Sequence, residues 1–280
     1  MLYIEKKNYM IKDQMIDFNG ILIATKSCGS GKDAIIFIHG SCMSSDTWLP
    51  QLNNQELNSK YRLIAFDLPG NGQSGWFKND TKGYRPKNIT PLIKTIIEKF
   101  NVERYLLVGL SYGTNIIGEI DPPLQNCAGI LLEGVCIVND AFPASAIITP
   151  GPNGHVIVAA NPTDQELRDY TFLNVKSKEV GERFIKSYRS ADPAFREELG
   201  RTMMESDMSD ELENIRNWNL PVCVIFGKEE KLVKTDYLNE FEPLWNKKVY
   251  HIENASHVVN EEAPKEFNKI LLSFAAEVFK

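Results

Sequence analysis

The chain has 280 residues, of which 43% are hydrophobic and 24% charged, and its formal net charge at pH 7 is −6. This composition is typical of a globular protein with a large core, and it excludes disordered and collagen-like classes. The acidic balance, with the two signs interleaved, argues against a surface for nucleic acid or anionic membrane. We expect no signal peptide and no membrane span, because no run approaches the ~18 apolar residues that a span needs.

The cysteines and histidines show neither a disulfide framework nor a metal-binding pattern. Five cysteines lack a C-x-x-C spacing, and this odd number predicts reduced thiols in a cytoplasmic protein. Four histidines occur without an H-E-x-x-H motif, which argues against a zinc site. We therefore expect no metal site. The serine chemistry considered below likewise implies no organic cofactor, and a small molecule is the expected partner.

The expected strands are short apolar runs rich in β-branched residues. In chain order they span residues 21–28, 34–40, 61–68, 104–110, 128–134, 221–227 and 247–253. Several are apolar throughout, which is typical of strands covered on both faces in a parallel sheet. Helices are expected between them at 46–56, 89–100, 112–120, 234–241 and 263–279. The alternation predicts an α/β fold with a mostly parallel, doubly wound sheet of about eight strands.

The alternation of strands and helices stops between residues 139 and 219. This stretch has a Pro/Gly loop followed by polar helical segments, which predicts a helical lid inserted before the strand that bears the candidate acid. The expected division is a core of residues 1–138 and 220–280 and a lid of residues 139–219. The sequence C-G-S-G-K-D at 28–33 lacks the spacing of a phosphate-binding loop, so we predict a hairpin turn there.

The sequence G-L-S-Y-G places Ser111 between Gly109 and Gly113, after an expected strand and before an expected helix. This context is typical of a nucleophile elbow, in which a sharp turn strains the serine backbone and requires small neighbours. The free N–H groups at the start of the helix lie beside the hydroxyl, where a developing oxyanion could be held. The motif predicts Ser111 as a nucleophile.

A serine hydroxyl needs a base, and the base needs an orienting carboxylate. His257 is the best-placed histidine, because it lies in a short polar loop after the last expected strand. Glu230 also follows a strand, and the order Ser111, Glu230, His257 matches the Ser–acid–His order of one large fold. We prefer Glu230 as the acid and leave Glu229 and Glu133 open as alternatives.

Two backbone N–H groups are candidate oxyanion donors. One belongs to Tyr112, after the nucleophile, and the other to Ser41, in an H-G-S loop after an earlier strand. His39 in that loop is expected to support the loop rather than to act as the base. The pocket is expected to be apolar, with Phe142 and Cys42 as candidate wall residues.

Five loops together resemble the α/β-hydrolase superfamily, in order and over nearly the whole chain. They are H-G-S-C-M-S-S-D-T-W at 39–48, D-L-P-G-N-G-Q-S at 67–74, G-L-S-Y-G-T at 109–114, F-G-K-E-E-K-L-V at 226–233 and N-A-S-H-V-V-N-E-E-A-P at 254–264. Within the superfamily, the chain is most similar to the lid-bearing N-acyl-homoserine lactonases. Residues 50–74 and 220–233 carry that similarity, including a glutamate in place of the more common aspartate acid.

The resemblance implies a serine hydrolase that cleaves a small, fairly apolar carboxylic ester or lactone through an acyl-enzyme. It assigns the nucleophile, base, acid and oxyanion donors to the residues named above, and it adds Tyr170 of the lid as a substrate contact. Perhydrolysis, carbon–carbon hydrolysis and cyanohydrin cleavage use the same groups and stay open. A hydrolase-fold ligand receptor with little turnover is the alternative from another class.

Overall fold

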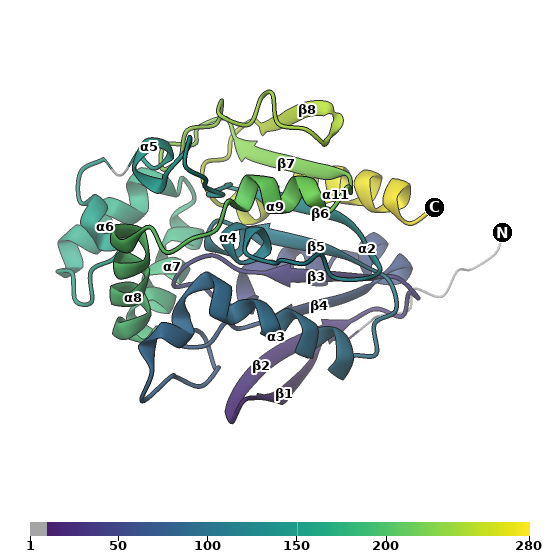
Figure 1. Ribbon diagram of the computed structural model, residues 1–280, viewed down its shortest axis with the longest axis horizontal. Helices are drawn as coiled ribbons and strands as arrows, with labels where there is room; N and C mark the ends of the chain where they lie inside the picture. The colour runs from purple at the N-terminus through teal and green to yellow at the C-terminus, as the bar shows by residue number, and fades with distance from the viewer. Residues whose placement is uncertain (1–9, 150) are drawn as a thin grey trace.

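An eight-stranded sheet forms the centre of the computed structural model, which describes residues 10–149 and 151–280 (Figure 1). The spatial order is β1-β2-β4-β3-β5-β6-β7-β8. Strands β3 to β8 run parallel to one another, whereas β2 is antiparallel to both of its neighbours. The strands are β1 Lys12–Phe18, β2 Ile21–Cys28, β3 Ala34–Ile38, β4 Arg62–Phe66, β5 Tyr105–Leu110, β6 Cys127–Glu133, β7 Val222–Gly227 and β8 Leu244–Ile252.

Helices cover both faces of the sheet, with α3, α4 and α9 on one face and α2 and α11 on the other (Figure 1). The α-helices are α1 Leu49–Leu52, α2 Gln55–Lys60, α3 Pro86–Lys99, α4 Tyr112–Gly118, α5 Ala144–Ile147, α6 Asp164–Asn174, α7 Lys178–Ser190, α8 Pro193–Glu205, α9 Glu211–Asn217, α10 Val259–Glu262 and α11 Pro264–Val278. Short 3₁₀ helices are η1 Ser45–Trp48, η2 Thr81–Tyr84 and η3 Gly154–Ile157. The mostly parallel α/β architecture expected from the sequence is confirmed.

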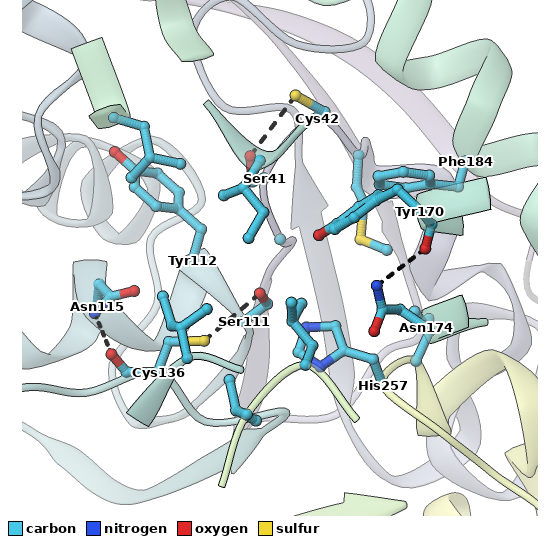
Figure 2. A pocket seen from close by; sticks show the side chains of 18 of the residues that line it. Ser41, Cys42, Ser111, Tyr112, Asn115, Cys136, Tyr170, Asn174, Phe184 and His257 are labelled. Carbon is cyan, nitrogen blue, oxygen red and sulfur yellow. Dashed lines mark hydrogen bonds between the residues drawn. The ribbon is translucent and has the colours of Figure 1, made fainter. Parts of the chain in front are cut away.

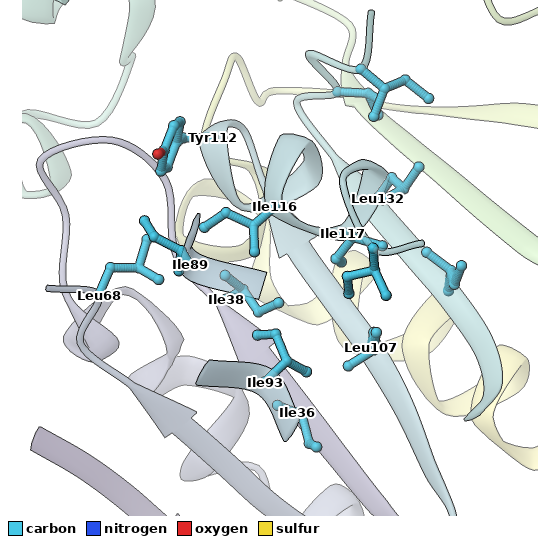
Figure 3. Packing of buried hydrophobic residues seen from close by; sticks show 14 of the residues in the cluster. Ile36, Ile38, Leu68, Ile89, Ile93, Leu107, Tyr112, Ile116, Ile117 and Leu132 are labelled. Atoms are coloured by element: carbon cyan, nitrogen blue, oxygen red, sulfur yellow. The ribbon is translucent and has the colours of Figure 1, made fainter. Parts of the chain in front are cut away.

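The central strands are apolar throughout because both of their faces are covered. All residues of β3 and β5 are buried. Alternate side chains point to opposite faces of a strand, so each strand supplies two hydrophobic clusters. Figure 3 shows the cluster on the α3 and α4 side, where Ile36, Ile38 and Leu107 pack with Ile89, Ile93, Ile116 and Ile117. On the other face, Phe37 packs against Trp48, which in turn contacts Phe267 of α11.

Three local predictions are wrong. No hairpin joins β2 to β3 through residues 28–33, because β4 lies between these strands in the sheet. The helix expected at 46–56 is broken into η1, α1 and α2, since Asn54 caps the start of α2 with its side chain. Residues 234–241 form turns instead of a helix, because their backbone and side chains bond to other segments. For example, the Lys234 N–H donates to the Ile147 carbonyl, and the Tyr237 hydroxyl contacts the loop after β6.

Helices α5 to α9 occupy the chain between β6 and β7, where the sequence predicts a lid. Helices α6, α7 and α8 gather beyond one end of the sheet (Figure 1). Helix α9 instead packs beside α4, and the Asn214 side chain donates to the Gly118 carbonyl at 2.8 Å. A Cβ on Gly118 would lie 2.6 Å from the Glu211 side chain, which explains why the α4 helix ends in a glycine. The lid boundary at residue 219 stays a prediction, with α9 in the layer of helices that covers the sheet.

A buried arginine at the start of α3 joins this layer to α8. Arg85 donates to Glu198 at 2.6 Å and forms further ion pairs with Glu205 and Asp207. Arg201 of α8 binds the same Glu198 carboxylate at 2.7 Å from a largely exposed position. The Glu198 side chain is almost fully buried. Burial by itself would raise the pKa of Glu198. The hydrogen bonds from Arg85 and Thr81 and the charges of Arg85 and Arg201 together outweigh burial and lower the pKa of Glu198.

We expect Arg85→Met to lower the free energy of unfolding by about 3 kcal/mol, because it leaves a buried carboxylate without its main partner. Denaturant unfolding at neutral pH measures this loss. Arg201→Met is the matched control, since its side chain is 45% exposed and such a pair contributes less than about 1 kcal/mol. Equal losses in the two variants would contradict the role of Arg85 as the buried anchor.

Across residues 10–149 and 151–280, no helix combines the length and the apolarity that crossing a membrane requires.

Candidate active site

Ser111 lies at the sharp turn between β5 and α4. Its backbone has φ 50° and ψ −118°, a conformation that non-glycine residues rarely adopt. The turn is held in place because the Ser111 N–H donates to the Glu133 carbonyl at 2.9 Å, and the Thr114 N–H donates to the Ser111 carbonyl at 2.7 Å. Such strain costs on the order of 1–3 kcal/mol and persists only where the surroundings enforce it.

The positions of Gly109 and Gly113, which flank Ser111, require glycine, because other backbone segments pass very close to them. A Cβ on Gly109 would lie 2.8 Å from the Gly113 carbonyl oxygen, and a Cβ on Gly113 would lie 2.4 Å from the Ile38 carbonyl oxygen. Helix α4 therefore starts in direct contact with the ends of β3 and β5. Any larger residue at these positions would push the helix and Ser111 away from the sheet.

His257 and Glu230 meet where the loops after β7 and β8 cross. The His257 Nδ1 lies 2.8 Å from the Glu230 Oε2, and both side chains are buried. The loops approach closely because Gly227 has no side chain: a Cβ there would lie 2.1 Å from the Ser256 carbonyl oxygen. Gly134 likewise leaves room for the imidazole, since a Cβ there would lie 2.9 Å from the His257 Cε1.

The Glu230 carboxylate is held in its ionised form. Its second oxygen accepts hydrogen bonds from the N–H groups of Leu232 at 2.8 Å and Val233 at 3.4 Å. Burial alone would raise the pKa of Glu230, but the charge and hydrogen bond of His257, together with these two N–H groups, lower it. An ionised acceptor at Nδ1 keeps the proton of a neutral imidazole on that nitrogen. The lone pair is then on Nε2, which is buried and has no partner.

The two alternative acids lie elsewhere. Glu229 is exposed to solvent and forms an ion pair with Lys176. Glu133 is fully buried, where its Oε1 accepts the Asn260 N–H at 2.7 Å, and burial raises its pKa well above the ordinary value. Of the three candidates, the structure brings Glu230 to His257.

His39 supports the loop that carries Ser41. Its Nδ1 lies 2.7 Å from the Gly40 carbonyl, and its Nε2 accepts the Leu68 N–H at 2.9 Å. Burial lowers the pKa of His39, so the imidazole stays neutral and fits this pair of hydrogen bonds. The loop thus held approaches the serine closely, because a Cβ on Gly40 would lie 3.2 Å from the Ser111 Cβ.

A cavity extends from Ser111 toward the helices α6, α7 and α8 (Figure 2). It encloses about 930 Å³ of free space, part of which opens to solvent, and apolar side chains dominate its wall. Of the residues predicted from the sequence, the following line it: Ser41, Cys42, Ser111, Tyr112, Tyr170 and His257. Phe142 does not. Its ring is about one-third exposed and packs on Tyr237 at 5.5 Å between ring centroids.

Sequence reasoning missed four polar residues of this cavity: Asn115, Cys136, Thr171 and Asn174. The Cys136 Sγ lies 3.9 Å from the Ser111 Oγ, and the apolar sequence around Cys136 gives no sign of this position. Asn174, at the end of α6, lies between Tyr170 and His257 (Figure 2). The one signal for Asn174 in the sequence is its spacing of four from Tyr170, which places the two on the same face of a helix.

The comparison with known families agrees with this architecture. A model of the alpha/beta hydrolase family matches residues 35–270. The chain belongs to the α/β-hydrolase family. Uncharacterized hydrolase YugF of Bacillus subtilis is 24% identical over 250 residues, which cover 87% of this hydrolase and 90% of the relative. The 3-oxoadipate enol-lactonase 1 of Acinetobacter baylyi is 21% identical over 253 residues, which cover 88% and 89%.

Solved structures share the fold of this α/β-hydrolase. A mutant of the N-acyl homoserine lactonase AidH, complexed with N-hexanoyl homoserine lactone, matches with a TM-score of 0.87 and 21% identity, over 96% of this chain and 98% of that one. The esterase RhEst1 from Rhodococcus matches with a TM-score of 0.73 and 20% identity, over 96% and 99%. At these identities the likeness establishes the fold.

Proposed function

We propose that this α/β-hydrolase is a serine hydrolase that cleaves an uncharged carboxylic ester or lactone. The observation that carries the proposal is the buried Nε2 of His257. It has no partner, it lines the same cavity as Ser111, and the opposite ring nitrogen is held by Glu230. A base, its orienting carboxylate and a hydroxyl on a strained turn are the three parts that activate a serine.

In the proposed mechanism, the Ser111 Oγ attacks the substrate carbonyl while the His257 Nε2 takes the hydroxyl proton. Glu230 stabilises the imidazolium that forms. The N–H groups of Ser41 and Tyr112 hold the oxyanion, at about 2.7–4 kcal/mol for each donor in comparable sites. The C–O bond of the ester then breaks, and His257 returns its proton to the leaving alcohol. A water molecule activated by His257 attacks the acyl-enzyme, and the acid leaves as Ser111 regains its proton.

The cavity wall supports an uncharged substrate. Among the described residues that line it, none is Asp, Glu, Lys or Arg. A substrate carboxylate would be moved out of water without a cation among the lining residues to pair with, which costs several kcal/mol. The name 3-oxoadipate enol-lactonase denotes a carboxylate substrate for that relative, whereas the lactone in the AidH complex is uncharged. We therefore assign uncharged substrates to this enzyme.

Two esters of equal length test this assignment. We expect kcat/KM for p-nitrophenyl butyrate to exceed that for mono-p-nitrophenyl succinate by at least about 100-fold, because a carboxylate replaces the terminal methyl group. Release of p-nitrophenol measures both rates, each divided by the rate of spontaneous hydrolysis. Equal turnover would contradict the uncharged class while leaving the serine mechanism in place.

A fluorophosphonate probe separates a hydrolase from a ligand receptor. The hydrolase mechanism predicts rapid covalent labelling at Ser111, mapped by mass spectrometry, with loss of esterase activity in parallel. Lack of labelling together with tight binding of an intact lactone would favour the receptor and overturn the proposed function.

A further inference from the structure

We infer that Asn174 selects substrates that carry a hydrogen-bond donor close to the scissile carbonyl. The Asn174 Oδ1 would accept a hydrogen bond from an amide N–H or a hydroxyl of the substrate. The inference rests on the proposed function for the orientation of the substrate, and it narrows the substrate class to esters and lactones that carry an amide N–H or a hydroxyl group near the scissile carbonyl.

The orientation of the Asn174 amide is fixed by the helix to which it belongs. Its Nδ2 donates to the Tyr170 carbonyl at 2.9 Å, one helical turn earlier. The reverse orientation would place two acceptor oxygens against each other, so the Oδ1 must point away from this carbonyl. The side chain is buried, and the Oδ1 is fully buried without a hydrogen-bond partner. Figure 2 shows the amide between Tyr170 and the ring of His257.

The main chain of Asn174 places this oxygen beside the proposed base. The Asn174 carbonyl accepts the His257 N–H at 3.3 Å and the Ser256 hydroxyl at 2.9 Å. Figure 2 shows the side-chain amide on the same part of the wall, next to the His257 ring. A substrate whose carbonyl lies at Ser111 would present atoms only a few bonds away from that carbonyl to the Asn174 Oδ1.

Several other polar groups of the wall have partners. The Thr171 hydroxyl donates to the Leu167 carbonyl, and the Asn115 amide donates to the Cys136 carbonyl and to Glu211. Among the described residues that line the cavity, two buried polar side-chain atoms have no partner: the His257 Nε2 and the Asn174 Oδ1. The proposed mechanism uses the first for proton transfer. The second has no role in that mechanism.

A buried acceptor without a partner is costly, and a ligand that supplies a donor removes this cost. A site built in this way discriminates against an analogue that lacks the donor, since the acceptor then stays unpaired in the complex. Apart from the Tyr170 hydroxyl, the wall offers few polar groups without a partner, so the contact with Asn174 has a large share in specificity.

The experiment compares two ligands that differ in one group. N-butanoyl homoserine lactone carries an amide N–H next to the lactone ring, and its carba twin has a methylene in place of that N–H. Binding of both is measured by calorimetry on the Ser111→Ala protein, so the result does not depend on turnover. The ratio of kcat/KM for the two ligands is measured on the protein with Ser111 intact.

We expect the parent to prefer the amide over its twin by at least about tenfold, both in binding and in kcat/KM. Asn174→Leu is expected to reduce this preference to about twofold or less. Asn174→Ala is expected to do the same with a smaller side chain, so a folding defect of one variant does not decide the outcome. Thr171→Val is the matched control on the same helix, because its hydroxyl already has a partner. This variant should change the binding and the turnover of both ligands equally and leave the preference for the amide unchanged.

An unchanged ratio in both Asn174 variants, or equal binding of amide and twin by the parent, would overturn the inference. The second result would mean that a water molecule satisfies the Asn174 Oδ1. Failure of the proposed function gives a different pattern, in which p-nitrophenyl butyrate is not hydrolysed in a Ser111-dependent way while the binding ratio still responds to Asn174.

Discussion

Ser111→Ala is expected to lower kcat for p-nitrophenyl butyrate by on the order of 10⁵-fold, because the proposed mechanism has no other nucleophile. The variant should fold normally, since the one side-chain contact of the hydroxyl is the Cys136 Sγ at 3.9 Å. Initial rates with the purified variant measure the loss of kcat, and a thermal unfolding curve measures whether the variant is folded. A variant that keeps full esterase activity would refute the serine mechanism.

Cys136 provides the control for this variant, because its sulfur is a nucleophilic atom close to the Ser111 hydroxyl. Burial raises the pKa of Cys136 to about 12, so very little thiolate exists near neutral pH. Cys136→Ala is therefore expected to change kcat by less than about tenfold. A loss as large as that of Ser111→Ala would indicate that the thiol, rather than the hydroxyl, attacks the substrate.

Glu230→Gln is expected to lower kcat by roughly 10⁴-fold, the effect of changing the orienting carboxylate to an amide in such triads. The glutamine can donate an N–H to the His257 Nδ1, which favours the tautomer with its proton on Nε2. That tautomer cannot accept the proton of Ser111. Steady-state kinetics at neutral pH measure the loss, and the KM is expected to change little.

Glu229→Gln is the matched control, since the adjacent glutamate is exposed and pairs with Lys176. It should retain kcat to within about twofold.

The pH dependence of stability offers a second test of Glu230. A carboxyl whose pKa is lowered on folding contributes stability above its unfolded pKa, near the ordinary value of 4.5, and loses it as pH falls through the folded pKa. The parent is therefore expected to lose more stability on acidification than Glu230→Gln, and a steeper loss in the variant would contradict this assignment.

The parts of the site predictable from sequence are those that follow strand ends. Ser111 directly follows β5, and Glu230 and His257 lie in the loops after β7 and β8. Parallel strands bring their carboxyl ends, and therefore these loops, to one edge of a sheet. The small residues Gly109 and Gly113 could be predicted for the same reason, since the turn leaves no space for a side chain.

The rest depends on contacts between distant segments. Strand β1 was missed because it is an edge strand in which only Ile16 and Phe18 are buried, so its apolar alternation is short. The turns at 234–241 have a helical pattern of apolar residues, yet bonds to the lid and to the loop after β6 fix their backbone instead. Phe142 was expected in the pocket from its hydrophobicity alone, which does not specify the direction of a side chain.

The hydrogen bonds that join the predicted lid to the loop of the proposed base have a consequence for protein engineering. The Glu262 carboxylate accepts the Lys176 and Ser177 N–H groups at the start of α7, and it also accepts the Ser256 N–H and hydroxyl. Recombination between homologues at residues 139 and 219 would transfer one half of this junction without the other. A functional chimera must therefore inherit residues 256–262 from the same parent as its lid, although more than 35 residues of chain separate the end of the lid from residue 256.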